Sequence, residues 1–301
     1  MKTIAVAPVA LFLAAPLLAV DDHVAREDFD LYFSSEGSGK PIILLSGGPG
    51  QTVEYMKEVG ALLPPGFRHI LLEQRGTGRS QPPNLSSDNL SLRRYVEDLE
   101  ALREHLKLDR LILVGHSWGG FLAMAYASAF PDRAERLIVI APSGASPEYQ
   151  QWLWDNVVSR LHTEDKESLA YWRKAFQRGF DKNAAGSEIV RSYWPGYFYD
   201  RAKGLAWAAQ LPDRFINVAV AEIMIPALQK SIDIRPGLVR INCPVLIIQG
   251  HQDPIGQKPV EEIHSLIKSS TLRYIPKSGH FPWVEQPEPI RTALNEFLTS
   301  K

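Results

Sequence analysis

The chain has 301 residues, of which 45% are hydrophobic and 22% charged, a composition typical of a globular protein with a sizeable core. Lysine and arginine number 33 and aspartate and glutamate number 34, so no excess of basic charge predicts binding to nucleic acid or to an anionic membrane surface. The single cysteine, Cys243, excludes an internal disulfide and a cysteine-based metal cluster.

The first segment of the chain has the form of a secretory signal peptide. Lys2 is followed by an apolar run over residues 4–20, after which the sequence turns acidic at Asp21. We expect cleavage after Ala19, and therefore an exported protein, periplasmic or secreted, with no stable membrane insertion once the leader is removed. The alternative is a membrane anchor, which the two prolines in the run and its shortness disfavour.

Strands and helices alternate over the next part of the chain. Polar alternation predicts an exposed antiparallel strand at 28–33. Continuous apolar runs predict strands buried on both faces at 41–45, 69–72, 111–114 and 136–140. Apolar residues at helical spacing predict helices at 51–63, 91–106 and 121–130. This order is typical of a parallel sheet with right-handed helical crossovers.

The alternation stops near residue 143 and resumes with strands at 244–248 and 271–275 and a helix at 290–298. The segment between, 143–235, is helical and rich in aromatic residues, and we interpret it as a cap inserted between two strands, over the carboxyl edge of the sheet. The sequence therefore predicts an α/β fold, with a mostly parallel central sheet flanked by helices. The core is expected to comprise residues 20–142 and 236–301.

A glycine-rich turn, residues 115–120, joins the strand at 111–114 to the helix that follows. In a G-x-S-x-G elbow the chain reverses within a few residues and holds the serine in a strained conformation, which glycines at the flanking positions permit. Gly115 and Gly119 occupy those positions around Ser117, which is the predicted nucleophile. The alternative is an ordinary turn in which Ser117 only caps the helix.

Candidates for the other catalytic roles lie on loops that follow predicted strands. His280 is the candidate base and Asp253 the residue that orients it, and the chain order serine, aspartate, histidine is the order this elbow fold uses. The backbone N–H groups of Gly48 and Trp118 are the candidate oxyanion hole. Each residue alone could be an ordinary loop residue, but together they lie at one sheet edge and favour a catalytic role for Ser117.

Nothing in the sequence predicts a metal or a cofactor. The remaining histidines show no paired spacing such as H-E-x-x-H, and there is neither a Walker loop nor a G-x-G-x-x-G stretch after a strand. His116 is expected to point along the elbow rather than into the cleft.

These motifs resemble those of the α/β-hydrolase superfamily, and within it the prolyl aminopeptidase (proline iminopeptidase) family. Members carry HGGPG, DQRGxGxS and GGSWG, and the corresponding stretches here are SGGPG at 46–50, EQRGTGRS at 73–80 and GHSWGG at 115–120. The resemblance implies an α/β-hydrolase fold with a helical cap and a serine hydrolase that needs no cofactor.

The resemblance also implies where a substrate amine would bind. The family holds the charged imino group with glutamates from the cap. Glu222 matches one of them, whereas no glutamate closely follows Trp207, where the family places the other. Ser46 stands in place of the family's histidine and Glu73 in place of its aspartate. The candidate substrate-binding residues are Glu222, Trp207 and Trp194.

Three functions are compatible with the sequence. The first is a prolyl aminopeptidase-like enzyme that releases N-terminal proline or a small residue from short peptides through an acyl-enzyme. The second is a carboxylesterase, lactonase or amidase that uses the same triad on a small apolar substrate. The third is a non-catalytic receptor, against which an intact triad argues. Two carboxylates in the cleft, one of them Glu222, would favour the first function, and a wholly apolar lining would favour the second.

Overall fold

A mixed eight-stranded sheet organises residues 20–300, the part of the chain that the computed structural model describes. The predicted signal peptide, residues 1–19, lies outside this part. The strand order is β1-β2-β4-β3-β5-β6-β7-β8, with antiparallel pairing of β1 with β2 and of β2 with β4, and parallel pairing elsewhere. The strands span Val20–Ala25 (β1), Asp30–Gly37 (β2), Lys40–Leu45 (β3), Phe67–Leu72 (β4), Leu111–His116 (β5), Ala134–Ile140 (β6), Val245–Gly250 (β7) and Ser270–Ile275 (β8).

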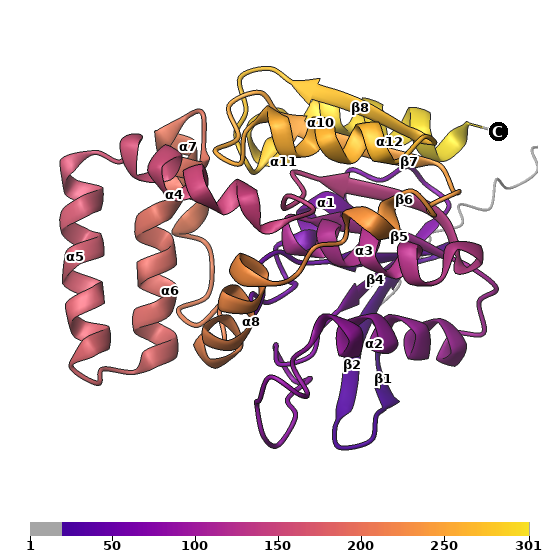
Figure 1. Cartoon of the computed structure of the whole chain (residues 1–301), viewed down its shortest axis with the longest axis horizontal. Coiled ribbons are helices and arrows are strands. Elements are labelled where there is room, and N and C mark those ends of the chain that lie inside the picture. The colour runs from indigo at the N-terminus through magenta and orange to yellow at the C-terminus, as the bar shows by residue number, and fades with distance from the viewer. Residues whose placement is uncertain (1–19, 301) are drawn as a thin grey trace, which may run out of the picture.

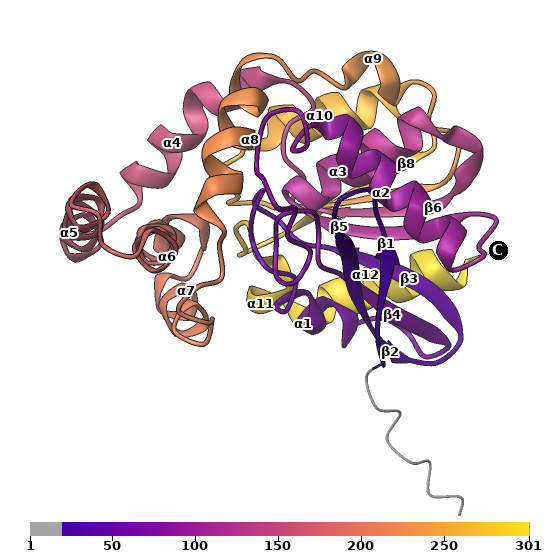
Figure 2. The same cartoon turned by 90° about the horizontal axis from the view of Figure 1, so that it is seen from below.

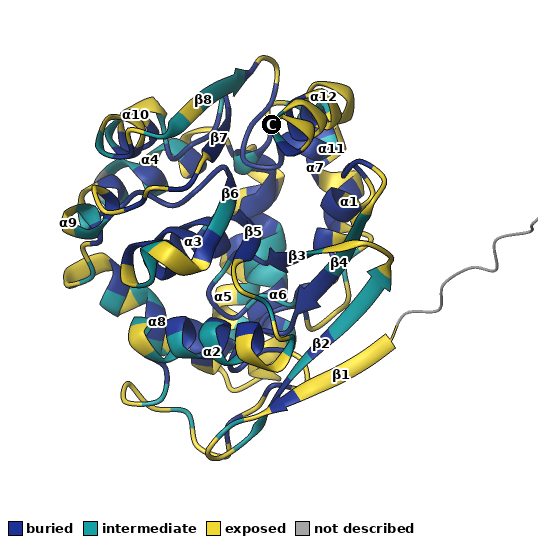
Figure 3. Cartoon of the chain, turned by 90° about the vertical axis from the view of Figure 1, so that its right-hand side faces the viewer, coloured by how far each residue is buried: buried dark blue, intermediate teal, exposed yellow. Residues whose placement is uncertain are grey.

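Helices cover both faces of the sheet, which explains why its central strands are continuous apolar runs. One face packs against α2, α3 and α10, and the other against α1, α11 and α12 (Figure 2). Burial is complete along β5, whereas β1 at the sheet edge is largely exposed (Figure 3). These helices span Met56–Gly60 (α1), Leu92–His105 (α2), Trp118–Ala129 (α3), Gln257–Leu266 (α10), Pro282–Glu285 (α11) and Pro287–Thr299 (α12).

The structure confirms the predicted fold class and the predicted strands, and it differs at other elements. β1, α10 and α11 were not expected from the sequence. The helix predicted over 51–63 is wrong in its first turn, because the backbone there pairs with a distant segment. Gln51 forms a β-bridge with Ile216, and the Thr52 N–H donates to the Phe215 carbonyl oxygen at 2.9 Å. The chain becomes helical only where this pairing ends.

The segment between β6 and β7 is helical and stands to one side of the sheet (Figure 1). Its first helices pack around a small apolar cluster that also includes Ile255, whereas α8 and α9 contribute Met224, Leu228 and Leu238 to the apolar cluster that α2 and α3 form with one face of the sheet. The second half of this segment, which contains α8 and α9, is therefore packed into the main core. Within residues 20–300, no helix combines the length and apolarity needed to cross a membrane. The helices span Gln150–Ser159 (α4), Thr163–Gln177 (α5), Lys182–Tyr193 (α6), Arg201–Ala208 (α7), Val218–Lys230 (α8) and Arg235–Leu238 (α9).

Candidate active site

The turn between β5 and α3 has the strained geometry of a nucleophile elbow. Ser117 has φ 53° and ψ −116°, in a region that residues with a side chain rarely adopt. A Cβ on Gly115 would collide with the carbonyl of Gly119, and a Cβ on Gly119 would collide with the carbonyl of Leu45. The two glycines therefore let α3 approach the sheet closely, and Ser117 is held at the apex.

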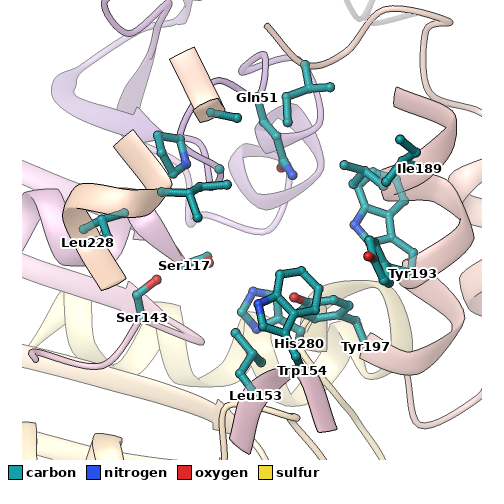
Figure 4. A pocket seen from close by; sticks show the side chains of 18 of the residues that line it. Gln51, Ser117, Ser143, Leu153, Trp154, Ile189, Tyr193, Tyr197, Leu228 and His280 are labelled. Carbon is teal, nitrogen blue, oxygen red and sulfur yellow. The ribbon is translucent and has the colours of Figure 1, made fainter. Parts of the chain in front are cut away.

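The predicted base and its orienting carboxylate meet at the same sheet edge. Asp253 follows β7 and His280 follows β8, and His280 Nδ1 lies 2.9 Å from Asp253 Oδ2. Both residues are buried, with 4% and 5% of their surface exposed. The other oxygen, Asp253 Oδ1, accepts the Ile255 N–H at 2.9 Å, which fixes the carboxylate. Because Nδ1 is committed to Asp253, Nε2 is the nitrogen left for Ser117, which lines the same cavity (Figure 4).

The loop after β3 lies against the nucleophile. A Cβ placed on Gly47 would be 3.3 Å from the Cβ of Ser117. The Gly47 N–H is committed, since it donates to Tyr55 Oη at 2.5 Å, whereas Gly48 lines the cavity. Trp118 is the first residue of α3, and N–H groups at a helix start have no acceptor within the helix. The N–H groups of Gly48 and Trp118 remain the predicted oxyanion hole.

His116 differs from its predicted orientation: it is among the residues that line the cavity, and its ring links the catalytic loops. Tyr55 Oη lies 2.8 Å from His116 Nδ1, and His116 Nε2 lies 3.1 Å from the His280 carbonyl oxygen. Burial lowers the pKa of His116 well below its usual value, so the ring is neutral. Because Tyr55 Oη accepts the Gly47 N–H, the Tyr55 hydroxyl proton is donated to His116 Nδ1. His116 therefore carries its proton on Nε2 and donates it to the His280 carbonyl oxygen. Sequence reasoning missed Tyr55, whose place in a predicted helix gave no sign of this contact.

A second hydrogen-bond network, centred on Gln74, holds the loop after β3. The Gln74 side-chain amide donates to the Ser46 carbonyl oxygen at 2.9 Å and to Ser46 Oγ at 3.0 Å. Gln74 Oε1 accepts the indole N–H of Trp118 at 2.9 Å. Ser46, which replaces the family's histidine, in turn donates to the Gln51 carbonyl oxygen at 3.0 Å. The EQRG stretch therefore acts through Gln74, a role that the motif alone did not reveal.

Glu285 fastens the His280 loop to the cap. Its carboxylate accepts the N–H groups of Gly279 at 2.6 Å, Asp200 at 2.7 Å and Tyr199 at 3.3 Å. Burial raises the pKa of Glu285, and these three hydrogen bonds oppose that rise. Glu285 is another residue that the sequence did not single out.

The cavity above Ser117 has a volume of about 380 Å³. Gln51, Ser143 and Tyr193 are among the side chains on its walls (Figure 4). Of the residues that the structure describes, no aspartate, glutamate, lysine or arginine lines this cavity. The walls are mainly aliphatic and aromatic, with residues such as Leu153, Trp154, Phe176, Ile189, Val190, Ile216 and Leu228.

The structure places one of the three predicted substrate-binding residues on the cavity wall. Trp194 lines the cavity, but Glu222 and Trp207 do not. Glu222 is exposed, because its neighbour Ala221 occupies the cavity face of α8 and successive helical residues are about 100° apart. Trp207 turns toward α1, where its indole N–H donates to Glu58 at 2.8 Å, and its ring lies 4.6 Å from that of Phe281.

The chain as a whole is similar to known proteins. A family model described as alpha/beta hydrolase fold matches residues 40–287. A proline iminopeptidase from Heyndrickxia coagulans is 29% identical over 276 residues, which cover 89% of this chain and 93% of that protein.

Solved structures share the fold over nearly the whole chain. A proline iminopeptidase-related protein from Thermus thermophilus matches with a TM-score of 0.74 and 24% identity, covering 94% of this chain and 98% of its own. An esterase from Exiguobacterium antarcticum matches with a TM-score of 0.68 and 20% identity, covering 92% and 99%. The same fold is therefore found in a proline iminopeptidase-related protein and in an esterase.

Proposed function

Because the chain belongs to the α/β-hydrolase fold family and is a serine hydrolase similar to prolyl aminopeptidases, we propose that it hydrolyses uncharged carboxylic esters through an acyl-enzyme. Related lactones and amides with an apolar acyl group fall in the same class. The observation that carries this proposal is the uncharged lining of the cavity above Ser117.

In the proposed reaction, Ser117 Oγ attacks the substrate carbonyl while His280 Nε2 takes the hydroxyl proton. Asp253 holds Nδ1–H and stabilises the imidazolium, and the N–H groups of Gly48 and Trp118 bind the oxyanion. His280 then gives its proton to the leaving oxygen, which leaves an acyl group on Ser117. A water molecule, deprotonated by His280, hydrolyses the acyl-enzyme and restores the serine.

Charge favours an uncharged acyl group over an N-terminal proline. A free N-terminus is cationic at neutral pH, and burying an ammonium group without an opposing charge costs several kcal/mol. Glu222, the carboxylate that the resemblance implies, is exposed and outside the cavity. Similarity to the proline iminopeptidase of Heyndrickxia coagulans supports aminopeptidase activity as the second candidate.

The decisive test compares proline with its uncharged isostere. Purified protein would be given the p-nitrophenyl esters and p-nitroanilides of proline and of cyclopentanecarboxylic acid, which differ in the ring nitrogen. We expect kcat/KM to favour the cyclopentane compounds at least about 10-fold within each pair, after division by the uncatalysed rates. Preference for proline in both pairs would instead establish the aminopeptidase.

The same preparations separate an enzyme from a receptor. We expect a fluorophosphonate probe to label the wild-type protein and to fail with Ser117→Ala. Ser128→Ala is the matched control, because Ser128 lies near the other end of α3, outside the cavity. An unlabelled wild-type protein, beside a labelled reference hydrolase, would favour the receptor.

Export is a further part of the proposal and rests on the apolar run that begins the sequence. Expression of the full chain should yield a product that begins at Val20 outside the cytoplasm. Mass spectrometry of the N-terminus checks this, and an intact Met1 in the recovered protein would contradict it.

A further inference from the structure

The side-chain amide of Gln51 faces the cavity from a rigid piece of backbone. Figure 4 shows it directed into the open space from the wall formed by the segment after β3. Gln51 pairs with Ile216 in a β-bridge, and the Asn217 N–H donates to the Gly50 carbonyl oxygen at 2.8 Å. The Gln51 carbonyl oxygen accepts Ser46 Oγ at 3.0 Å. These contacts fix the Cα and therefore the direction of the Cα–Cβ bond.

Two other polar side chains of the cavity, Tyr149 and Tyr193, already have hydrogen-bond partners. Hydrogen bonds from Ser143 and Gln150 lower the pKa of Tyr149, opposing the rise that burial causes. Tyr193 Oη accepts a hydrogen bond from Arg173. The hydrogen bonds found within residues 20–300 involve the Gln51 carbonyl but not its side-chain amide. Gln51 thus offers one acceptor and two donor hydrogens to whatever fills the cavity.

We propose that Gln51 determines specificity by binding a carboxamide in the acyl part of the substrate. This rests on the proposed ester hydrolysis and names the substrate class. A purely apolar acyl group would displace water from the Gln51 amide and leave it unpaired, which disfavours binding. A carboxamide carries both a donor and an acceptor and so matches both halves of the amide. Sites built to hydrogen-bond a substrate discriminate strongly against analogues that lack the group.

The test uses acyl groups of equal length. The p-nitrophenyl esters of N-acetylglycine, 4-oxopentanoic acid and pentanoic acid have a carboxamide, a ketone and a methylene chain, respectively. We expect the kcat/KM ratio of N-acetylglycine to pentanoate to fall at least about 10-fold in Gln51→Met. Intrinsic ester reactivity cancels, because the same two esters are compared in both enzymes. The N-acetyl-β-alanine and hexanoate pair repeats the test one atom further from the carbonyl.

A second variant tests the donor half of the amide. Gln51→Glu keeps the size of the side chain but replaces the N–H donors with an acceptor. The ketone can only accept a hydrogen bond, so the ratio of 4-oxopentanoate to pentanoate should fall in Gln51→Glu. Gln257→Met is the control for both variants, since Gln257 is exposed at the start of α10. Thermal unfolding of each variant reports on folding.

The outcomes separate the two levels of the proposal. Ester turnover with both ratios unchanged within about twofold overturns the role of Gln51 alone. Absence of turnover for every ester overturns the ester hydrolase and the role of Gln51 together.

Discussion

The two walls of the cavity above Ser117 differ in chemistry and in origin. The wall supplied by the sheet loops carries polar groups held by hydrogen bonds, such as those that join Gly47, Tyr55 and His116. The wall supplied by α4 and α6 is mainly apolar and includes Leu153 and Ile189. We therefore expect the catalytic groups at the sheet edge to determine the reaction, and the cap, together with Gln51, to select the group that is transferred.

This difference predicts two kinds of mutational effect. A change in the catalytic hydrogen-bond network at the sheet edge, which includes Asp253 and Tyr55, should lower turnover of every substrate by a similar factor, because all substrates share the same transition-state charges. A change on the cap side, or at Gln51 on the segment after β3, should alter the ranking of substrates more than their best rate.

Asp253→Asn should have the largest effect. The amide cannot hold His280 in the tautomer that leaves Nε2 free to accept a proton, and the analogous change in a serine protease lowers kcat about 10⁴-fold. We expect kcat to fall about 10³- to 10⁴-fold for every ester. Steady-state kinetics measure this, with Asp132→Asn at an exposed site as the control. A loss below about 10-fold would remove Asp253 from the catalytic group.

Tyr55→Phe should have the next largest effect, because it removes both the acceptor of the Gly47 N–H and the donor to His116. Leaving a buried donor unpaired costs about 1–3 kcal/mol, which corresponds to about 5- to 160-fold in kcat if it acts on the oxyanion loop.

Tyr95→Phe provides the matched control for Tyr55→Phe. Tyr95 is also buried, and its hydroxyl donates to the Arg75 carbonyl oxygen at 3.0 Å. It should lose stability in thermal unfolding but keep the wild-type kcat. Equal kcat losses in the two variants would mean that Tyr55 acts only through folding.

Trp154→Leu should reorder substrates instead. Trp154 lines the cavity from α4, so a smaller side chain lengthens the space for the acyl group. We expect the kcat/KM ratio of decanoate to butyrate esters to rise about 10-fold. Trp172→Leu is the control, since Trp172 packs on Tyr171 and Phe180 away from the cavity. An equal loss of kcat/KM for both esters would contradict the expected difference between the two walls.

The sequence predicted the sheet-side wall well because backbone rules place its residues. Buried strands are continuous apolar runs, and the loops after parallel strands meet at one edge, so Ser117, Asp253 and His280 could be brought together without coordinates. The contact of Tyr55 with His116 could not be predicted, because it joins side chains from elements whose relative positions no local pattern specifies.

The cap-side residues were harder to predict for a related physical reason. Trp194 and Trp207 are both buried aromatics in the cap, and hydrophobicity alone does not say which one faces a cavity. Trp207 faces α1 because Glu58 accepts its indole N–H. A helix such as α8 has an apolar face that packs on the core and another that lines the cavity, and composition does not separate them.

Glu222→Gln should have the smallest effect. If Glu222 held a substrate amine, loss of its charge would weaken turnover of aminoacyl substrates far more than that of uncharged esters. Because Glu222 is exposed on α8, outside the cavity, we expect kcat/KM to change less than about twofold for proline and cyclopentanecarboxylate esters alike. Steady-state assays of the two esters, with Gln229→Glu as a charge control on the same helix, measure the difference. A loss of kcat/KM for the proline ester alone would show that Glu222 turns into the cavity when substrate binds. In that case the cap would recognise the substrate amine.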